Sequence, residues 1–290
     1  MYEKLEECPV CKHSQFTNHL ICDDHSVSGE SFALVKCKKC SLVFTNPRPE
    51  QGALPDYYQS DQYISHTDKG NSLINFIYKL VRKYTIRRKV KLIDKLNRGQ
   101  GSLLDYGCGT GDFIKTANKK GWHAYGYEPD KDAQNIASSK NPDKLLDRIE
   151  NHKDQFNIIT AWHVIEHVSE LNKTIKTLKK QLATDGHLII ALPNHKSYDA
   201  AFYKEYWAGY DVPRHLYHFD QESIKSFATK FKLRLIHTLP MKFDSYYVSM
   251  LSEKYKGKSN LLNALKIGLN SNNKAIKTND YSSLIYIFKK

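Results

Sequence analysis

The chain has 290 residues, 40% of them apolar and spread along the whole sequence, which predicts one large core or one core plus a small module. No run of about 18 apolar residues occurs and the N-terminus lacks the apolar core of a secretion signal, so we expect no transmembrane helix and a cytoplasmic protein. The net charge of +13 suits nucleic acid, an anionic membrane surface, an acidic substrate or simply a basic surface.

Four of the six cysteines form two Cys-x-x-Cys pairs, Cys8/Cys11 and Cys37/Cys40. Each pair supplies two sulfur ligands from one tight turn, and tetrahedral zinc needs four. The spacing therefore predicts a zinc ribbon over residues 1–50 whose folding depends largely on bound Zn²⁺. Cys22 and Cys108 are left over and are more typical of small apolar fillers. A ribbon can bind nucleic acid, bind a protein or cover an active site.

Residues 51–98 form a connecting segment that begins with a tyrosine-rich stretch. From residue 71 to residue 96, apolar side chains recur at helical spacing while lysines and arginines occupy the opposite face. This pattern predicts one long basic amphipathic helix. Its basic face is either a solvated surface or a binding face for a phosphate-bearing or membrane partner.

A buried strand ending in an acid is predicted just before a glycine-rich loop. The apolar run ends at Asp105, and Gly107, Gly109 and Gly111 follow before a helical pattern begins. Glycines let the backbone turn tightly and approach a ligand closely, although a turn needed only for packing is the alternative. About 20 residues further on, a second strand ends at Glu128, where a carboxylate can accept both hydroxyls of a ribose. Together the two features predict a nucleoside site.

The stretch Asp105-x-Gly-Cys-Gly-Thr-Gly resembles motif I of the class I S-adenosylmethionine-dependent methyltransferases, and the resemblance covers about residues 100–290. It implies an α/β, Rossmann-like core over residues 99–290, with a seven-stranded sheet whose last strand is antiparallel. It also implies S-adenosylmethionine as the cofactor. The cofactor-binding residues that it implies are Asp105, Gly107, Cys108, Gly109, Glu128, Pro129 and Trp162, with Asp147 as a further candidate beside the adenine.

In zinc-ribbon methyltransferases of similar layout, a tyrosine-rich segment before motif I folds over the cofactor. The resemblance thus makes Tyr58, Tyr63 and His66 candidates for a lid that contributes to the substrate pocket. Surface packing between the two modules is the alternative.

The strand predicted over residues 156–162 continues into His163-Val-Ile-Glu166-His167-Val, which resembles the Glu-His-Val signature of the family. Three interpretations stay open. His163 or His167 can act as a general base. His163, Glu166 and His167 can bind a divalent metal, since some ubiquinone-type O-methyltransferases hold one at the corresponding Glu-x-x-Glu-His. Glu166 and His167 can also simply hold the loop by a hydrogen bond.

An aromatic insert over residues 195–219 follows the next predicted strand and ends in Asp211-Val-Pro-Arg214-His215. Insertions at this place typically form the acceptor pocket in this fold. Trp207 and Arg214 are therefore candidates for the substrate pocket. His215 and His218 are candidate bases. The alternative is that Arg214 pairs with Asp211 and that His215 packs against Trp207.

The remaining sequence predicts a helix over 221–231, a strand over 234–239, a helix over 245–268, a polar loop at 270–273 and a last strand over 282–288. The whole pattern predicts a methyltransferase that acts on an oxygen or carbon of a small molecule, such as a sugar, a quinone-like compound or an acidic metabolite. The alternatives are an RNA-directed methyltransferase or nucleic-acid-binding module that uses the ribbon and the basic helix, and a cofactor-binding scaffold without catalysis.

Overall fold

The computed structural model describes residues 1–58 and 73–290, so the predicted lid residues Tyr63 and His66 lie outside the described residues. Two compact units divide the chain. Unit 1 comprises Met1–His66, Ile165–Asn172 and Ala191–Tyr286, and unit 2 comprises Thr67–Val164, Lys173–Ile190 and Ile287–Lys290. The domain boundaries after residues 50 and 98 that the sequence suggested stay predictions.

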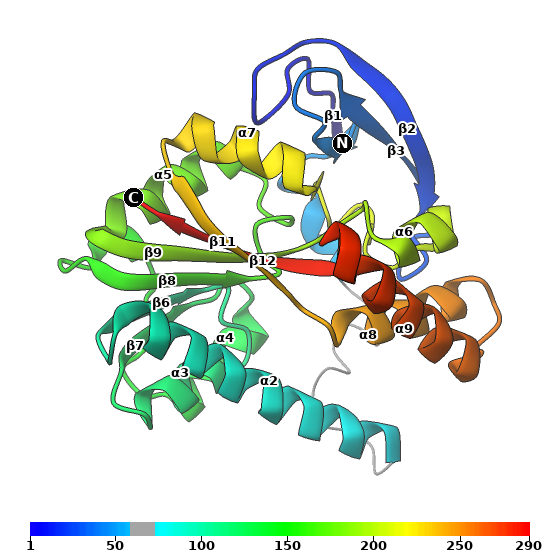
Figure 1. Cartoon of the computed structure of the whole chain (residues 1–290). Helices are drawn as coiled ribbons and strands as arrows, with labels where there is room; N and C mark the ends of the chain where they lie inside the picture. Colours follow the sequence, from blue (N-terminus) through cyan, green and yellow to red (C-terminus); the bar gives the residue numbers. More distant parts are fainter. Residues whose placement is uncertain (59–72) are drawn as a thin grey trace. The chain divides into compact units, whose positions relative to one another are not determined.

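A six-stranded sheet of order β11-β12-β9-β8-β6-β7 is the centre of the fold. Its strands are β6 (Ser102–Tyr106), β7 (His123–Tyr127), β8 (Phe156–Trp162), β9 (Leu182–Pro193), β11 (Arg234–Pro240) and β12 (Ser283–Lys289). β6 pairs in parallel with both β7 and β8, whereas β12 points against β9 and β11 (Figure 1). The mixed α/β sheet with an antiparallel last strand is therefore confirmed.

The resemblance implied seven strands, whereas the described residues form six in this sheet. Residues 145–147 contribute only an isolated bridge between Leu145 and Gly126. The chain is bracketed there by the left-handed backbone of Asp143 (φ 58°) and by the short 3-10 helix η2 (Ile149–Asn151), which leaves too little extended chain for a ladder.

Eight α-helices and two further 3-10 helices connect the strands in the described part of the chain. They are η1 (Leu54–Tyr58), α2 (Leu73–Asn97), α3 (Asp112–Asn118), α4 (Lys131–Lys140), α5 (Leu171–Gln181), α6 (Tyr198–Tyr203), η3 (Lys204–Tyr206), α7 (Gln221–Phe231), α8 (Asp244–Tyr255) and α9 (Leu261–Thr278). α2 confirms the long helix predicted before the glycine loop. None of the described helices is long and apolar enough to cross a membrane.

The cysteine-rich N-terminal segment and the aromatic insert share one sheet in unit 1. Its strand order is β10-β4-β3-β2, formed by β2 (Phe16–Asp23), β3 (Ser31–Cys37), β4 (Val43–Thr45) and β10 (Tyr217–His218). β10 belongs to the insert and pairs antiparallel with β4, while β1 (Tyr2–Glu3) pairs with β5 (Arg48–Pro49). Cys22, Phe32 and Leu34 are buried in the same core as Tyr203 and Trp207. The N-terminal segment is thus part of the unit that holds the insert.

The single helix predicted over residues 245–268 was wrong, because the chain breaks after α8. Gly257 adopts φ +71°, and the Asn260 side chain caps α9 by accepting from the backbone of Asn263. The polar loop predicted at 270–273 was also wrong, since these residues lie inside α9. There the Ser271 hydroxyl donates to Asp199 (2.5 Å), so a tertiary contact favours helix over loop.

Candidate functional site

The glycine loop of unit 2 leaves one position open to a ligand. Gly107 and Gly109 have left-handed backbones, with φ of +72° and +52°. A Cβ at Gly107 would lie 2.5 Å from the Val164 side chain, whereas a Cβ at Gly109 would meet nothing within 4 Å. Gly107 therefore serves close packing, and Gly109 faces free space at the carboxyl end of β6.

Glu128 is joined to this loop by its carboxylate. Oε2 accepts from the backbone N–H of Gly109 at 2.8 Å, and Oε1 accepts from that of Asp130 at 3.0 Å. Burial raises the pKa of Glu128, although both N–H groups favour its charged form. The structure thus brings together the loop and the acid that the sequence singled out.

Asp105 lies under the loop as a buried acid. Thr160 on the neighbouring strand β8 donates its hydroxyl to Asp105 Oδ1 at 2.6 Å, and burial raises the pKa of Asp105 to about 7. Thr160 was not predicted as a site residue. Thr160 lies opposite Asp105 because β6 and β8 pair in parallel in this register. No sequence motif reports that register.

Trp162, the last residue of β8, has an indole ring held by two neighbours. The Lys89 ammonium lies 4.2 Å from the ring centroid, and Phe113 meets the ring edge-on at 5.9 Å. Its Nε1 is buried and has no hydrogen-bond partner among the described residues. A donor of this kind can be satisfied by a bound ligand or a water.

The other predicted cofactor residues differ in exposure. Cys108 is buried beside Gly126, and burial raises the pKa of its thiol, so it resembles an apolar filler in the loop. Pro129 and Asp147 are both exposed. Asp147 follows the isolated bridge at Leu145.

Two basic residues of α2 contact the glycine loop region, which sequence reasoning missed. Arg82 forms an ion pair with Asp112 at 2.6 Å and donates to the Thr110 hydroxyl at 2.9 Å. Lys89 covers the ring of Trp162. Part of the basic face of α2 therefore makes contacts within unit 2. The sequence does not show which lysines and arginines of a helix make such contacts.

A second group of functional side chains lies in unit 1. Glu166, His167 and His215 each offer one ligand atom, and these atoms lie within 4.8 Å of one another. The sequence suggested His163 as the third member of this group, but His215 takes that place. His163 belongs to unit 2 and has a left-handed backbone (φ 56°) directly after β8. Such a conformation is costly for a residue with a Cβ and is enriched at functional sites.

The two histidine rings of this group contact each other edge to face, with centroids 4.5 Å apart. Nδ1 of His215 lies 2.9 Å from the carbonyl oxygen of Gly209. Because a carbonyl can only accept, Nδ1 carries a proton, which leaves Nε2, 3.9 Å from Asp211 Oδ2, as the nitrogen for a base or ligand role. Nδ1 of His167 lies 3.1 Å from the Tyr58 hydroxyl. His215 is thus oriented as a base or a metal ligand.

Arg214 is buried and holds two acids of unit 1. Its guanidinium donates to Asp24 Oδ1 and Asp211 Oδ1, both at 2.8 Å, and to the carbonyl of Tyr57 at 2.9 Å. These contacts lower the pKa of both carboxylates despite their burial. They favour the structural alternative for Arg214. His218 is also buried, and burial lowers its pKa well below the ordinary value, so it is neutral.

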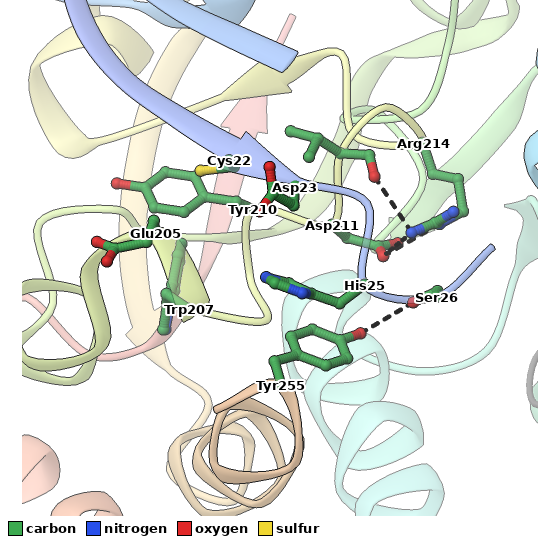
Figure 2. A pocket seen from close by; sticks show the side chains of 11 residues that line it. Cys22, Asp23, His25, Ser26, Glu205, Trp207, Tyr210, Asp211, Arg214 and Tyr255 are labelled. Atoms are coloured by element: carbon green, nitrogen blue, oxygen red, sulfur yellow. Dashed lines mark hydrogen bonds and ion pairs between the residues drawn. The ribbon is translucent and has the colours of Figure 1, made fainter. Parts of the chain in front are cut away.

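Trp207 and Arg214 line a small pocket in unit 1 that has room for about one water-sized molecule (Figure 2). The Trp207 indole donates to Asp199 at 2.8 Å, so the ring is fixed. His25 stacks between Tyr255 (4.8 Å) and Tyr206 (5.5 Å) at the same pocket. His25 and Tyr255 were not predicted, because they come from segments without a shared motif, whereas Tyr206 lies in the aromatic insert that the sequence singled out.

The four paired cysteines gather in unit 1 as free thiols. The Sγ atoms of Cys8 and Cys40 are 3.5 Å apart, as are those of Cys11 and Cys37. A tetrahedral zinc ion with Zn–S bonds of about 2.3 Å sets its sulfurs about 3.8 Å apart, so this group matches zinc in size and in ligand type. The contact with Cys40 lowers the pKa of Cys8 to about 5, which favours a thiolate.

Comparison with known proteins identifies a family that matches this chain. A family model described as a methyltransferase domain matches residues 78–238, more than half of the chain. No sequence among the curated proteins matches significantly.

Solved structures share the fold at low sequence identity. Magnesium protoporphyrin IX methyltransferase from Synechocystis, solved with bound S-adenosylhomocysteine, superimposes with a TM-score of 0.53 at 14% identity, covering 83% of this chain and 100% of that one. Phosphoethanolamine N-methyltransferase 2 from Haemonchus contortus, in complex with S-adenosylmethionine, has a TM-score of 0.51 at 16% identity. That match covers 86% of this chain and 62% of the other.

Proposed function

Because the chain belongs to the methyltransferase-domain family, we propose that it transfers the methyl group of S-adenosylmethionine to an oxygen or carbon atom of a small-molecule acceptor. The enzyme class is that of the S-adenosylmethionine-dependent methyltransferases. The two structural neighbours carry the names of small-molecule methyltransferases, of a porphyrin and of phosphoethanolamine. A sugar, a quinone-like compound and an acidic metabolite are the acceptors to test here first.

The observation that carries the proposal is the pairing of Gly109 with Glu128. The fit of the site rests on three features: free space at Gly109, a carboxylate at the ends of parallel strands, and the buried Trp162 Nε1 that lacks a protein partner among the described residues. Glu128 would accept the ribose hydroxyls, and Gly107 and Gly109 would let the backbone approach the ligand. Asp105 would support the loop from below.

S-adenosylmethionine supplies a methyl group on a sulfonium that is already electrophilic. The protein therefore has to orient the acceptor and, for a hydroxyl or a carbon acid, remove one proton. The acceptor's electron pair forms the new bond to the methyl carbon, the sulfur–carbon bond breaks, and S-adenosylhomocysteine leaves. The proton passes to the base.

We propose His215 as that base, with His167 beside it and His163 as the remaining candidate. His215 offers Nε2 for this role because Nδ1 donates to Gly209. His167 follows Trp162, the last residue of β8, by only five residues of chain. The chain between the two residues spans at most about 18 Å when fully extended.

A divalent metal held by Glu166, His167 and His215 is the alternative use of the same side chains. Two imidazoles and a carboxylate are a ligand set that suits first-row metals. Such an ion would activate an acceptor hydroxyl by lowering its pKa, whereas in the first proposal a histidine removes the proton. Metal analysis distinguishes the two. A second bound metal per chain, lost in Glu166→Gln while the cysteine-bound metal stays, supports this alternative.

We propose that Cys8, Cys11, Cys37 and Cys40 bind structural zinc. The zinc would stabilise the sheet that β4 forms with β10. His215 lies two residues before β10 in the chain. Thr45 of β4 donates its hydroxyl to the carbonyl of His215 at 2.9 Å. The cysteine module would thus help to position the residues that bind the acceptor, instead of serving an independent function.

Direct titration tests the proposal. Purified protein is titrated with S-adenosylmethionine and S-adenosylhomocysteine by calorimetry, and acceptor pools are then screened for formation of S-adenosylhomocysteine. Micromolar binding followed by turnover on one acceptor class is the expected result. Folded, zinc-loaded protein that binds neither compound would contradict it.

Nucleic acid stays a second candidate partner, supported by the charge of +13. It is less favoured because the cysteine module packs into the core of unit 1 and α2 uses Arg82 and Lys89 within unit 2. RNA binding that weakens steeply with salt, together with methylation of RNA, would favour it. A cytoplasmic location stays a prediction.

A further inference from the structure

α9 (Leu261–Thr278) presents several large apolar side chains to solvent. Leu262 is 80% exposed, Ile276 is 71% exposed and Leu269 is 50% exposed, and Leu265 is exposed as well. These four positions are spaced by three, four and seven residues, so they fall on one side of the helix. We call this set the leucine stripe.

The opposite side of α9 consists of small residues together with Ile267, and it packs inside unit 1. Ala264, Gly268, Ser271 and Ala275 are buried there. A Cβ at Gly268 would lie 2.7 Å from the Tyr246 ring of α8, and Ser271 donates to Asp199 of α6. The core of unit 1 therefore does not use the leucine stripe. Single exposed apolar residues are common, but an aligned stripe of bulky ones marks an interaction surface.

The charge of α9 indicates what kind of surface the stripe meets. Residues 261–278 contain no aspartate or glutamate. Lys266, Lys274 and Lys277 of this helix and Lys258 just before it are exposed. Asn272 donates to the carbonyl of Lys242 at 2.9 Å, which brings exposed Lys242 and Phe243 beside the same helix.

We propose that α9 docks in the plane of an anionic membrane surface, with the leucine stripe among the acyl chains and the lysines at the lipid phosphates. Helices that lie on membranes combine an apolar stripe with lysine-rich flanks, and long lysine side chains can reach the headgroups while their methylenes stay apolar. Anionic lipid attracts each nearby lysine. A symmetric pair of this chain is the less favourable occupant, because it would set lysine against lysine with no acid on α9 to neutralise them.

Vesicle co-sedimentation of the full-length protein tests this inference. The probes are vesicles of phosphatidylcholine alone and vesicles that also contain phosphatidylglycerol. The double variant Leu262→Asp/Ile276→Asp removes the stripe, and Lys266→Gln/Lys277→Gln removes charge. Ile21→Asp is the matched control, because Ile21 is 65% exposed and lies on β2, far in sequence from α9.

The wild type and Ile21→Asp should bind the phosphatidylglycerol vesicles, and binding should fall at high salt. The aspartate double variant should bind at least about tenfold more weakly, and the lysine variant should lose much of its preference for anionic lipid. Thermal melts and S-adenosylmethionine titrations should be unchanged in every variant, since α9's exposed side chains are not part of the glycine-loop site. A failure here therefore leaves the methyltransferase proposal intact.

Two outcomes would overturn the inference. One is wild-type protein that does not bind the anionic vesicles, or binds them as well after the aspartate substitutions. The other is a dimer, seen by analytical ultracentrifugation, that the aspartate variant dissociates while no vesicle binding occurs. The second result would assign the leucine stripe to contact between copies of the chain.

Discussion

The backbone N–H of Gly109 donates to Oε2 of Glu128 at 2.8 Å. These residues come from two different strand–loop transitions of unit 2, after β6 and β7, which pair in parallel. The pairing fixes the carboxylate at the same sheet edge as the glycine loop. A side chain held in this way needs little reorganisation to meet a ribose.

Glu128→Ala should weaken S-adenosylmethionine binding by at least about 10- to 100-fold, because even one hydrogen bond to a charged group contributes about 1.5–3 kcal/mol. Calorimetric titration measures the effect. Asp154→Ala is the control for removing an exposed carboxylate. Equal affinity of wild type and Glu128→Ala would contradict the assignment of this site.

Asp105 should make stability depend on pH in a recognisable way. Burial raises its pKa in the folded protein to about 7 from an ordinary value of 3.8. The folded state therefore binds the proton more tightly, so this residue's contribution to the free energy of unfolding falls as pH rises through the window from about 4 to 7. Asp105→Asn should gain stability relative to wild type over that window.

Urea denaturation at pH 5, 6, 7 and 8 measures this difference, with Asp147→Asn as the exposed control. The amide oxygen that Asp105→Asn introduces can still accept from Thr160, so the variant should fold. Parallel curves for wild type and Asp105→Asn would show that folding does not raise the pKa of Asp105.

His215→Ala should lower kcat by about 10²- to 10⁴-fold, the usual contribution of a general base, and leave S-adenosylmethionine affinity unchanged. Steady-state kinetics with the identified acceptor measures the effect. His237→Ala is the matched control, because His237 is exposed on β11. A normal kcat in His215→Ala would transfer the role to His167 or His163.

Cys37→Ser should reduce the bound zinc from one ion per chain and lower Tm, since metal binding and folding are coupled in small cysteine modules. Metal content is measured by plasma mass spectrometry, and stability by thermal melting. Cys22→Ser is the control, because Cys22 is a buried core residue outside the four-cysteine group. Full zinc content in Cys37→Ser would refute the four-ligand site.

Arg214→Met should destabilise the protein by about 3–5 kcal/mol, because it leaves the buried carboxylate of Asp24 and the half-buried carboxylate of Asp211 without their partner. The deficit should be larger at neutral pH than in acid. Both carboxylates have lowered pKa values in the folded state, so the stability they contribute is present above about pH 4 and is lost as pH falls through the folded values.

Chemical denaturation of Arg214→Met and of Asp24→Asn/Arg214→Met measures this effect. The double variant should recover part of the lost stability, since it removes one unpaired charge. A variant of unchanged stability with a raised KM would instead return Arg214 to the role of binding an acidic substrate.

Local sequence was sufficient for features whose physics lies within a few residues. Cys-x-x-Cys turns, a glycine loop between a strand and a helix, and an acid at the next strand end are all set by short-range geometry. The same holds for the long helix α2, which its periodic apolar residues predict. These are the residues that the cofactor and zinc proposals use.

Long-range packing decided the rest. Glu166 and His167 are adjacent in the chain, but His215 joins them from 48 residues away only because the insert folds back on the same unit. The burial of Arg214 between Asp24 and Asp211 could not be read from the sequence either, since Asp24 lies in the N-terminal segment. Sequence determines which chemical groups are available and how the backbone turns locally, whereas contacts between distant segments decide which of those groups meet, because their free energy exists only once the chain has folded.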